Sequence, residues 1–283
     1  LNQDSPFLRD VSSNDWVWQY NSDRRLRGLA LISHNIISIM TQQLEGKRQV
    51  FRINALPGRM MVSALSNNSD HGGRTGLAEY NNAGEFVASH WLPTDGDLRG
   101  AKKTGKMADG YGYDIRVQPR RNIMLTSSFT GWSNYMMDFG QMLQDSEAMK
   151  RFGNTMVLWD LHSRKPKKVF DVPGAPLEIR CAWGSNNNYC FTTTALTSKL
   201  WLIYEDKKGE WQAEAVADIG DPSKVPLPVD ISITSDDKGL WIDTFMDGKA
   251  RYFDISDPHL SLIHISEPTR RRGISYAVFC LKK

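Results

Sequence analysis

The strongest constraint on the fold is a strand pattern that occurs four times along the chain. The runs DIRV, EIRC and DISI begin at residues 114, 178 and 230, and a weaker copy, RINA, begins at residue 52. A turn and a second run rich in β-branched and aromatic residues follow each copy, at residues 122–128, 189–194, 240–245 and 60–65. Copies at steps of 62, 64 and 52 residues indicate an architecture of repeated units.

Each copy is followed by a second hairpin, so that one unit contains four strands. The first strand of this hairpin falls at residues 77–80, 156–160, 200–204 and 251–254, and the second at residues 85–88, 168–171 and 211–216. Four consecutive strands per repeat are typical of a β-propeller blade. A β-sandwich is the alternative, but a sandwich would not repeat this order. We therefore predict an all-β protein, a β-propeller with about four visible blades.

The propeller is expected to be incomplete and to occupy residues 50–259. Its fourth blade stops near His259 after three strands, and an open arc of blades leaves apolar faces and sheet edges uncovered. Residues 1–49 are poorly assigned and are consistent with remains of another blade. Because the chain starts at Leu1 without an initiator Met, we expect it to be truncated at its front. Only residues 138–152 show a helical stripe of apolar side chains.

Residues 260–283 differ in character from the rest of the chain. Residues 260–270 and 274–281 match the translation, in one reading frame, of two segments of a transposon-end sequencing adapter. The alternative is a natural basic tail that binds an acidic surface. We predict an artefact and no domain. Amplification of the natural locus across the junction tests this, and finding the same codons in genomic DNA would contradict it.

The charge of the chain depends on that segment. The whole chain has 35 Lys and Arg against 32 Asp and Glu, a net charge of +3. Without the five basic residues and one acidic residue of residues 260–283, 30 basic and 31 acidic residues remain, a net charge of −1. No charge excess then favours nucleic-acid binding, and no apolar run approaches the roughly 20 residues that span a bilayer. We expect neither a nucleic-acid nor a membrane partner, and the oligomeric state stays open.

Five segments, in the same order and with similar spacing, resemble the selenium-binding protein and methanethiol oxidase family. They lie at residues 112–122, 153–160, 176–180, 209–214 and 252–258, and residues 130–137 look like its bacterial branch. The resemblance implies a seven-bladed propeller that is periplasmic in bacteria, with a cytoplasmic location as the alternative. It also implies a copper-dependent enzyme that converts methanethiol, oxygen and water to formaldehyde, hydrogen sulfide and hydrogen peroxide. A small thiol is thus the expected substrate.

The sequence departs from the family where the family binds copper. The family's copper site is thought to rest on histidines, including a His-His pair, and this chain has no such pair. We therefore assign no residue of this chain as a copper ligand from the resemblance. We expect the chain by itself to be inactive. The alternative is a non-catalytic propeller without copper that binds selenium or another ligand or acts as a scaffold, because a fold does not determine an activity.

The candidate site residues come from the repeat itself. Asp114, Glu178 and Asp230 begin the predicted innermost strands, which line the channel of a propeller. They are candidate catalytic residues, as a ring of carboxylates around a metal or a proton path. The alternative, which we favour, is that each carboxylate caps neighbouring backbone N–H groups. His71, in a loop between hairpins, is a candidate metal ligand, although a solvated loop histidine is the favoured interpretation.

Cys181 and Cys190 lie on the two strands of one predicted hairpin. A disulfide between them is possible in an oxidising compartment. We expect two buried thiols instead, because cross-strand geometry is often poor for bridging. A thiol that forms a selenium adduct is a third possibility.

Overall fold

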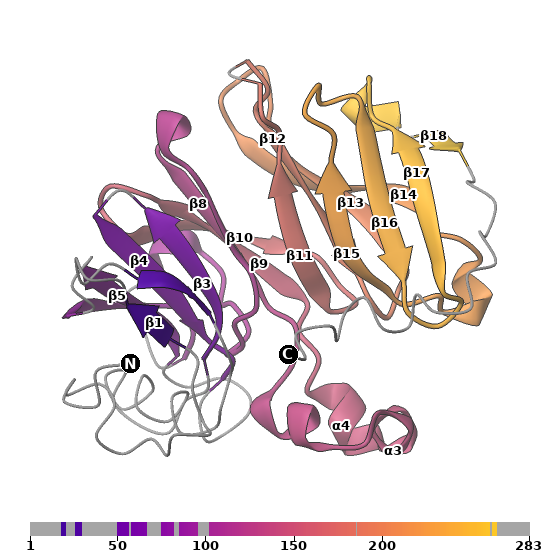
Figure 1. The fold of residues 1–283 in the computed structure, drawn as a ribbon, viewed down its shortest axis with the longest axis horizontal. Coiled ribbons are helices and arrows are strands. Elements are labelled where there is room, and N and C mark those ends of the chain that lie inside the picture. Colours follow the sequence, from indigo (N-terminus) through magenta and orange to yellow (C-terminus); the bar gives the residue numbers. More distant parts are fainter. Residues whose placement is uncertain are drawn as a thin grey trace. The chain divides into compact units, whose positions relative to one another are not determined.

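The structure is a computed structural model that describes residues 18–20, 26–29, 50–56, 58–66, 75–81, 85–95, 102–184, 186–260 and 262–264 (Figure 1). The chain divides into two compact units, Leu1–Asp171 and Val172–Lys283. Within the described residues, no helix has the length and apolar character needed to cross a membrane.

The first unit contains two four-stranded sheets, each an antiparallel meander in sequence order. Its strands are β3 (Val50–Leu56), β4 (Arg59–Ala64), β5 (Gly76–Asn81) and β6 (Phe86–Trp91), then β7 (Ile115–Gln118), β8 (Ile123–Ser127), β9 (Thr155–Asp160) and β10 (Lys165–Asp171). A separate hairpin joins β1 (Trp18–Tyr20) to β2 (Leu26–Leu29). The remaining residues of segment 1–49 lie outside the described residues, so the assignment of this segment stays a prediction.

The second unit repeats the same meander twice. Its strands are β11 (Pro176–Cys181), β12 (Tyr189–Thr194), β13 (Lys199–Glu205) and β14 (Trp211–Asp218), then β15 (Pro228–Ile233), β16 (Gly239–Thr244), β17 (Lys249–Asp254) and β18 (Leu262–His264). The predicted all-β fold of four propeller blades is thereby confirmed. Strand β18 falls within residues 260–283, where its backbone pairs with β17. Backbone pairing is open to any extended segment, so the interpretation of residues 260–283 stays a prediction.

Three of the four innermost strands, β3, β11 and β15, share an irregularity next to the repeated isoleucine. The register shifts between Val50 and Ile53 in β3, and the equivalent shifts in β11 and β15 precede Ile179 and Ile231. A β-bulge leaves a residue outside the ladder and turns its side chain in a new direction. Glu178 and Asp230 occupy these irregular positions, so the repeat itself places these two candidate carboxylates.

Each unit has its own apolar core between its two sheets. In the first unit, Met61 and Leu77 pack in one cluster with Ile115, Met124 and Trp159. In the second unit, the core takes most of its members from β12, β13, β15, β16 and β17, and it contains Phe191, Leu202, Ile231, Ile242 and Phe253. Burying one such side chain contributes roughly 1.5–3 kcal/mol, so these two clusters hold the sheets of each unit together.

The helix expected at residues 138–152 is two short helices, α3 (Phe139–Gln144) and α4 (Ser146–Lys150). The predicted helical character of this segment is confirmed, and the segment is divided because Asp145 ends one helix and caps the next. Its backbone N–H donates to the backbone carbonyls of Gln141 and Met142. Its carboxylate accepts hydrogen bonds from the N–H groups of Glu147 and Ala148. A side chain that captures these N–H groups starts a new helix and interrupts the old one.

Candidate functional site

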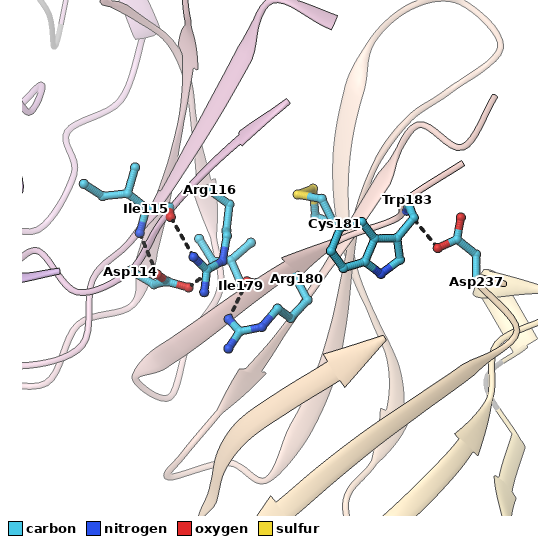
Figure 2. The surroundings of a disulfide bond; sticks show 9 residues. Asp114, Ile115, Arg116, Ile179, Arg180, Cys181, Trp183 and Asp237 are labelled. Carbon is cyan, nitrogen blue, oxygen red and sulfur yellow. Dashed lines mark hydrogen bonds and ion pairs between the residues drawn. A yellow bond between two sulfur atoms is a disulfide. The ribbon is translucent and has the colours of Figure 1, made fainter. Parts of the chain in front are cut away.

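In the first unit, Asp114 lies immediately before β7 and is 1% exposed. One carboxylate oxygen accepts the N–H of Ile115 at 2.9 Å, and the other lies 3.4 Å from Nε of Arg116 (Figure 2). The N–H of Asp114 donates to Oγ of Ser127 on β8 at 3.1 Å. Asp114 is thus paired on both sides and fixes the start of its strand.

In the second unit, Arg180 on β11 brings two candidate carboxylates together. Its Nη1 lies 2.8 Å from Oε2 of Glu178, and its Nη2 lies 2.9 Å from Oδ1 of Asp230 on β15. Nη1 also donates to the carbonyl of Ile179 at 2.9 Å. Glu178 is buried, whereas the side chain of Asp230 is 59% exposed. The guanidinium therefore ties the two sheets of this unit together at their innermost strands.

Asp230 also repeats the hydrogen bond seen at Asp114. Its Oδ1 accepts the N–H of Ile231 at 2.8 Å, and its own N–H donates to Oδ1 of Asp243 at 2.7 Å. These contacts support the interpretation that Asp114 and Asp230 cap backbone N–H groups. The carboxylate of Glu178 contacts Arg180. Whether Asp114, Glu178 and Asp230 also take part in catalysis stays a prediction.

A second charged cluster surrounds Glu79 on β5, which is 5% exposed. Its carboxylate contacts Nη2 of Arg164 at 2.9 Å, Nε2 of His90 at 2.7 Å and Nε of Arg59 at 3.4 Å. Burial raises the pKa of Glu79, but the hydrogen bonds and charges of Arg164 and His90 together hold it below its ordinary value. Burial also lowers the pKa of His90, against the effect of Glu79. This cluster joins the two sheets of the first unit.

The described residues do not form a site for copper. His90 is held by Glu79, His162 is exposed, and His259 contacts Glu214 and the ring of Tyr204. Within the described ranges, no three His, Cys, Asp or Glu side chains are grouped so that they could hold a metal ion. His71, the candidate ligand, lies outside the described residues. Its role stays a prediction.

Cys181 and Cys190 form a disulfide, so the expectation of two free thiols was wrong (Figure 2). The two residues are directly opposite in the β11–β12 register, with Cα atoms 3.9 Å apart. The neighbouring pair carries the ladder hydrogen bond from Ala182 N–H to the carbonyl of Tyr189. The cysteines therefore occupy a non-hydrogen-bonded pair, where opposite side chains come closest.

Sequence reasoning missed the arginine partners of the acidic residues. A signal was present, because Arg116 and Arg180 each stand two residues after the acid in two repeats. Side chains two residues apart lie on the same face of a strand, so a pair was foreseeable. The contact between Glu79 and Arg164 had no local signal, because the two residues are 85 positions apart.

Sheets of four antiparallel strands in sequence order, joined face to face by apolar cores, define this chain as part of a β-propeller protein. The family described as 56 kDa selenium-binding protein (SBP56) matches residues 17–263. The chain belongs to this family, as its sequence pattern predicted.

Named relatives and one solved structure agree with that assignment. The methanethiol oxidase of Ruegeria pomeroyi is 73% identical over 206 residues, which cover 72% of this chain and 47% of the relative. The methanethiol oxidase of a Hyphomicrobium species is 60% identical over 205 residues, covering 72% of this chain and 45% of that protein. The X-ray structure of a hypothetical selenium-binding protein from Sulfolobus tokodaii is similar with a TM-score of 0.59 and 22% identity, covering 76% of this chain and 48% of that one. The chain spans about half the length of the relatives it matches.

Proposed function

We propose that this chain is part of a bacterial methanethiol oxidase, which converts methanethiol, oxygen and water to formaldehyde, hydrogen sulfide and hydrogen peroxide. The observation that carries the proposal is the 73% identity to a protein named methanethiol oxidase over 206 residues. The reaction balances in atoms, with the thiol carbon oxidised and oxygen reduced to peroxide. A small thiol is therefore the proposed substrate.

The described residues contribute a frame to this proposed enzyme. Arginine and carboxylate pairs fix the start of β7 and the innermost strands of the second unit. Copper belongs to the proposal as the family's metal, since it binds soft ligands and cycles between one-electron states. The described side chains offer no grouped ligands, so we assign its ligands to other residues of the full-length protein and derive no chemical step through it.

The experiment uses the full-length protein encoded at the natural locus. Purified protein with about one copper per chain, and hydrogen peroxide release that depends on methanethiol, supports the oxidase. A folded protein that binds no copper and gives no peroxide would contradict it and favour a binding or scaffold propeller. Added copper is the control that separates an inactive protein from one that lost its metal during purification.

We also propose a periplasmic location for the full-length protein. The disulfide between Cys181 and Cys190 supports it, because disulfides persist in oxidising compartments and are rare in the bacterial cytoplasm. Cell fractionation with alkylation of free thiols before lysis tests this. Protein found in the cytoplasmic fraction with both cysteines alkylated would contradict it.

A further inference from the structure

The two cysteines of the disulfide differ in their exposure to solvent. Cys190 lies on the interior strand β12, between Cys181 on β11 and Ile203 on β13, and is 0% exposed. Cys181 is half-buried and lies at the end of β11, which is an edge strand of its sheet. Of the two cysteines, only Cys181 is therefore partly exposed to solvent.

We propose that the Cys181–Cys190 disulfide is an exchange site for small thiols, with Cys181 as the modified residue and Cys190 as the resolving thiol. Thiol–disulfide exchange starts with attack of a thiolate on one sulfur, and access decides which sulfur is attacked. Burial of Cys190 directs the attack to Cys181. Partial cover of Cys181 favours small thiols over large ones.

The exchange step is balanced without any oxidant. The incoming thiol loses its proton, and its sulfur bonds to Sγ of Cys181. The bond between the two cysteine sulfurs breaks, its electron pair leaves with Sγ of Cys190, and that sulfur takes up one proton. In the reverse step, Cys190 attacks Sγ of Cys181 and expels the small thiol.

The residues beyond Cys181 indicate what the exchange would change. The N–H of Trp183 donates to the buried carboxylate of Asp237 at 2.8 Å (Figure 2). The N–H of Gly184 donates to the same carboxylate at 2.7 Å. Asp237 follows β15, so this contact joins the tip of the β11–β12 hairpin to the other sheet of the second unit. Opening the disulfide removes a covalent restraint next to this contact, and we expect faster amide hydrogen exchange at Trp183 and Gly184.

The first test compares two variants that each keep one thiol. Methyl methanethiosulfonate should modify the Cys190→Ala variant, which retains Cys181, at least about tenfold faster than the Cys181→Ala variant. Circular dichroism and the urea midpoint show that both variants are folded. Equal rates, or faster reaction of Cys190, would overturn the assignment of Cys181 as the modified residue.

The second test uses the unmodified chain with 2-mercaptoethanol as the probe. After an acid quench, intact mass should show one added thiol group, and peptide mapping should place it on Cys181. Removal of the probe should restore the disulfide, whereas an adduct on the Cys190→Ala variant should persist. No adduct on the folded chain would overturn the proposal, and equal rates with glutathione would overturn the restriction to small thiols.

These experiments need neither copper nor oxidase activity. Failure of the exchange therefore leaves the proposed oxidase function untouched, and failure of that function leaves the exchange testable.

Discussion

His90, which contacts the buried carboxylate of Glu79, makes the stability of the first unit depend on pH. His90, Arg164 and Arg59 face this carboxylate. Burial lowers the pKa of His90 below its ordinary value of 6.5 in the folded protein, so the unfolded chain binds more protons in that range. We expect the free energy of unfolding to be retained above pH 6.5 and to decrease as the pH falls below it.

The His90→Gln variant tests this, because its amide still reaches Glu79 but does not titrate. Urea unfolding at about pH 7.5 and about pH 5.5 should show a smaller loss of stability in His90→Gln than in the unchanged chain. The exposed His162→Gln variant is the matched control and should keep the original loss. An unchanged loss in His90→Gln would show that another group carries the acid sensitivity.

At the scale of elements, Asp145 decides that residues 139–150 form two helices. The Asp145→Ala variant removes the acceptor of the Glu147 and Ala148 N–H groups, and we expect a loss of about 1 kcal/mol in the free energy of unfolding. Amide exchange at Glu147 and Ala148 should become faster. Ser146→Ala, at the next position, is the control and should change neither quantity. A stability unchanged in Asp145→Ala would contradict the capping role.

Elements with a regular period were predictable, and interruptions of that period were not. The positions of β7, β8, β11 and β12 follow from the repeated runs, because alternation of apolar residues is a local property. The break at Asp145 was hidden, because the apolar stripe continues across it. The disulfide was hidden for another reason. It depends on a register that places Cys181 opposite Cys190, and one residue of shift would separate the two side chains.

At the scale of the whole molecule, the equivalent strands β12 and β16 of two repeats differ in how their faces are covered. Every residue of the interior strand β12 is buried. On β16 the burial alternates instead, with Ile242 at 0% exposed and Trp241 at 43%. Both strands have the sequence pattern of a β-strand. They differ only in what packs against each of their faces. Local sequence predicts that a strand forms, whereas the cover of each face depends on the assembled sheets.

Two adjacent residues of β16 test this difference within one strand. Ile242 lies in the core of the second unit, so Ile242→Ala should lower the free energy of unfolding by about 3 kcal/mol through lost burial and a cavity. On the opposite face, the ring centroids of Trp241 and Tyr252 are 5.1 Å apart. Trp241→Ala should lower the free energy of unfolding by roughly 1 kcal/mol or less. Urea unfolding of both variants measures the contrast. Equal losses would mean that the face of Trp241 is packed in solution as tightly as the core, and the alternation along β16 would then not describe the folded chain.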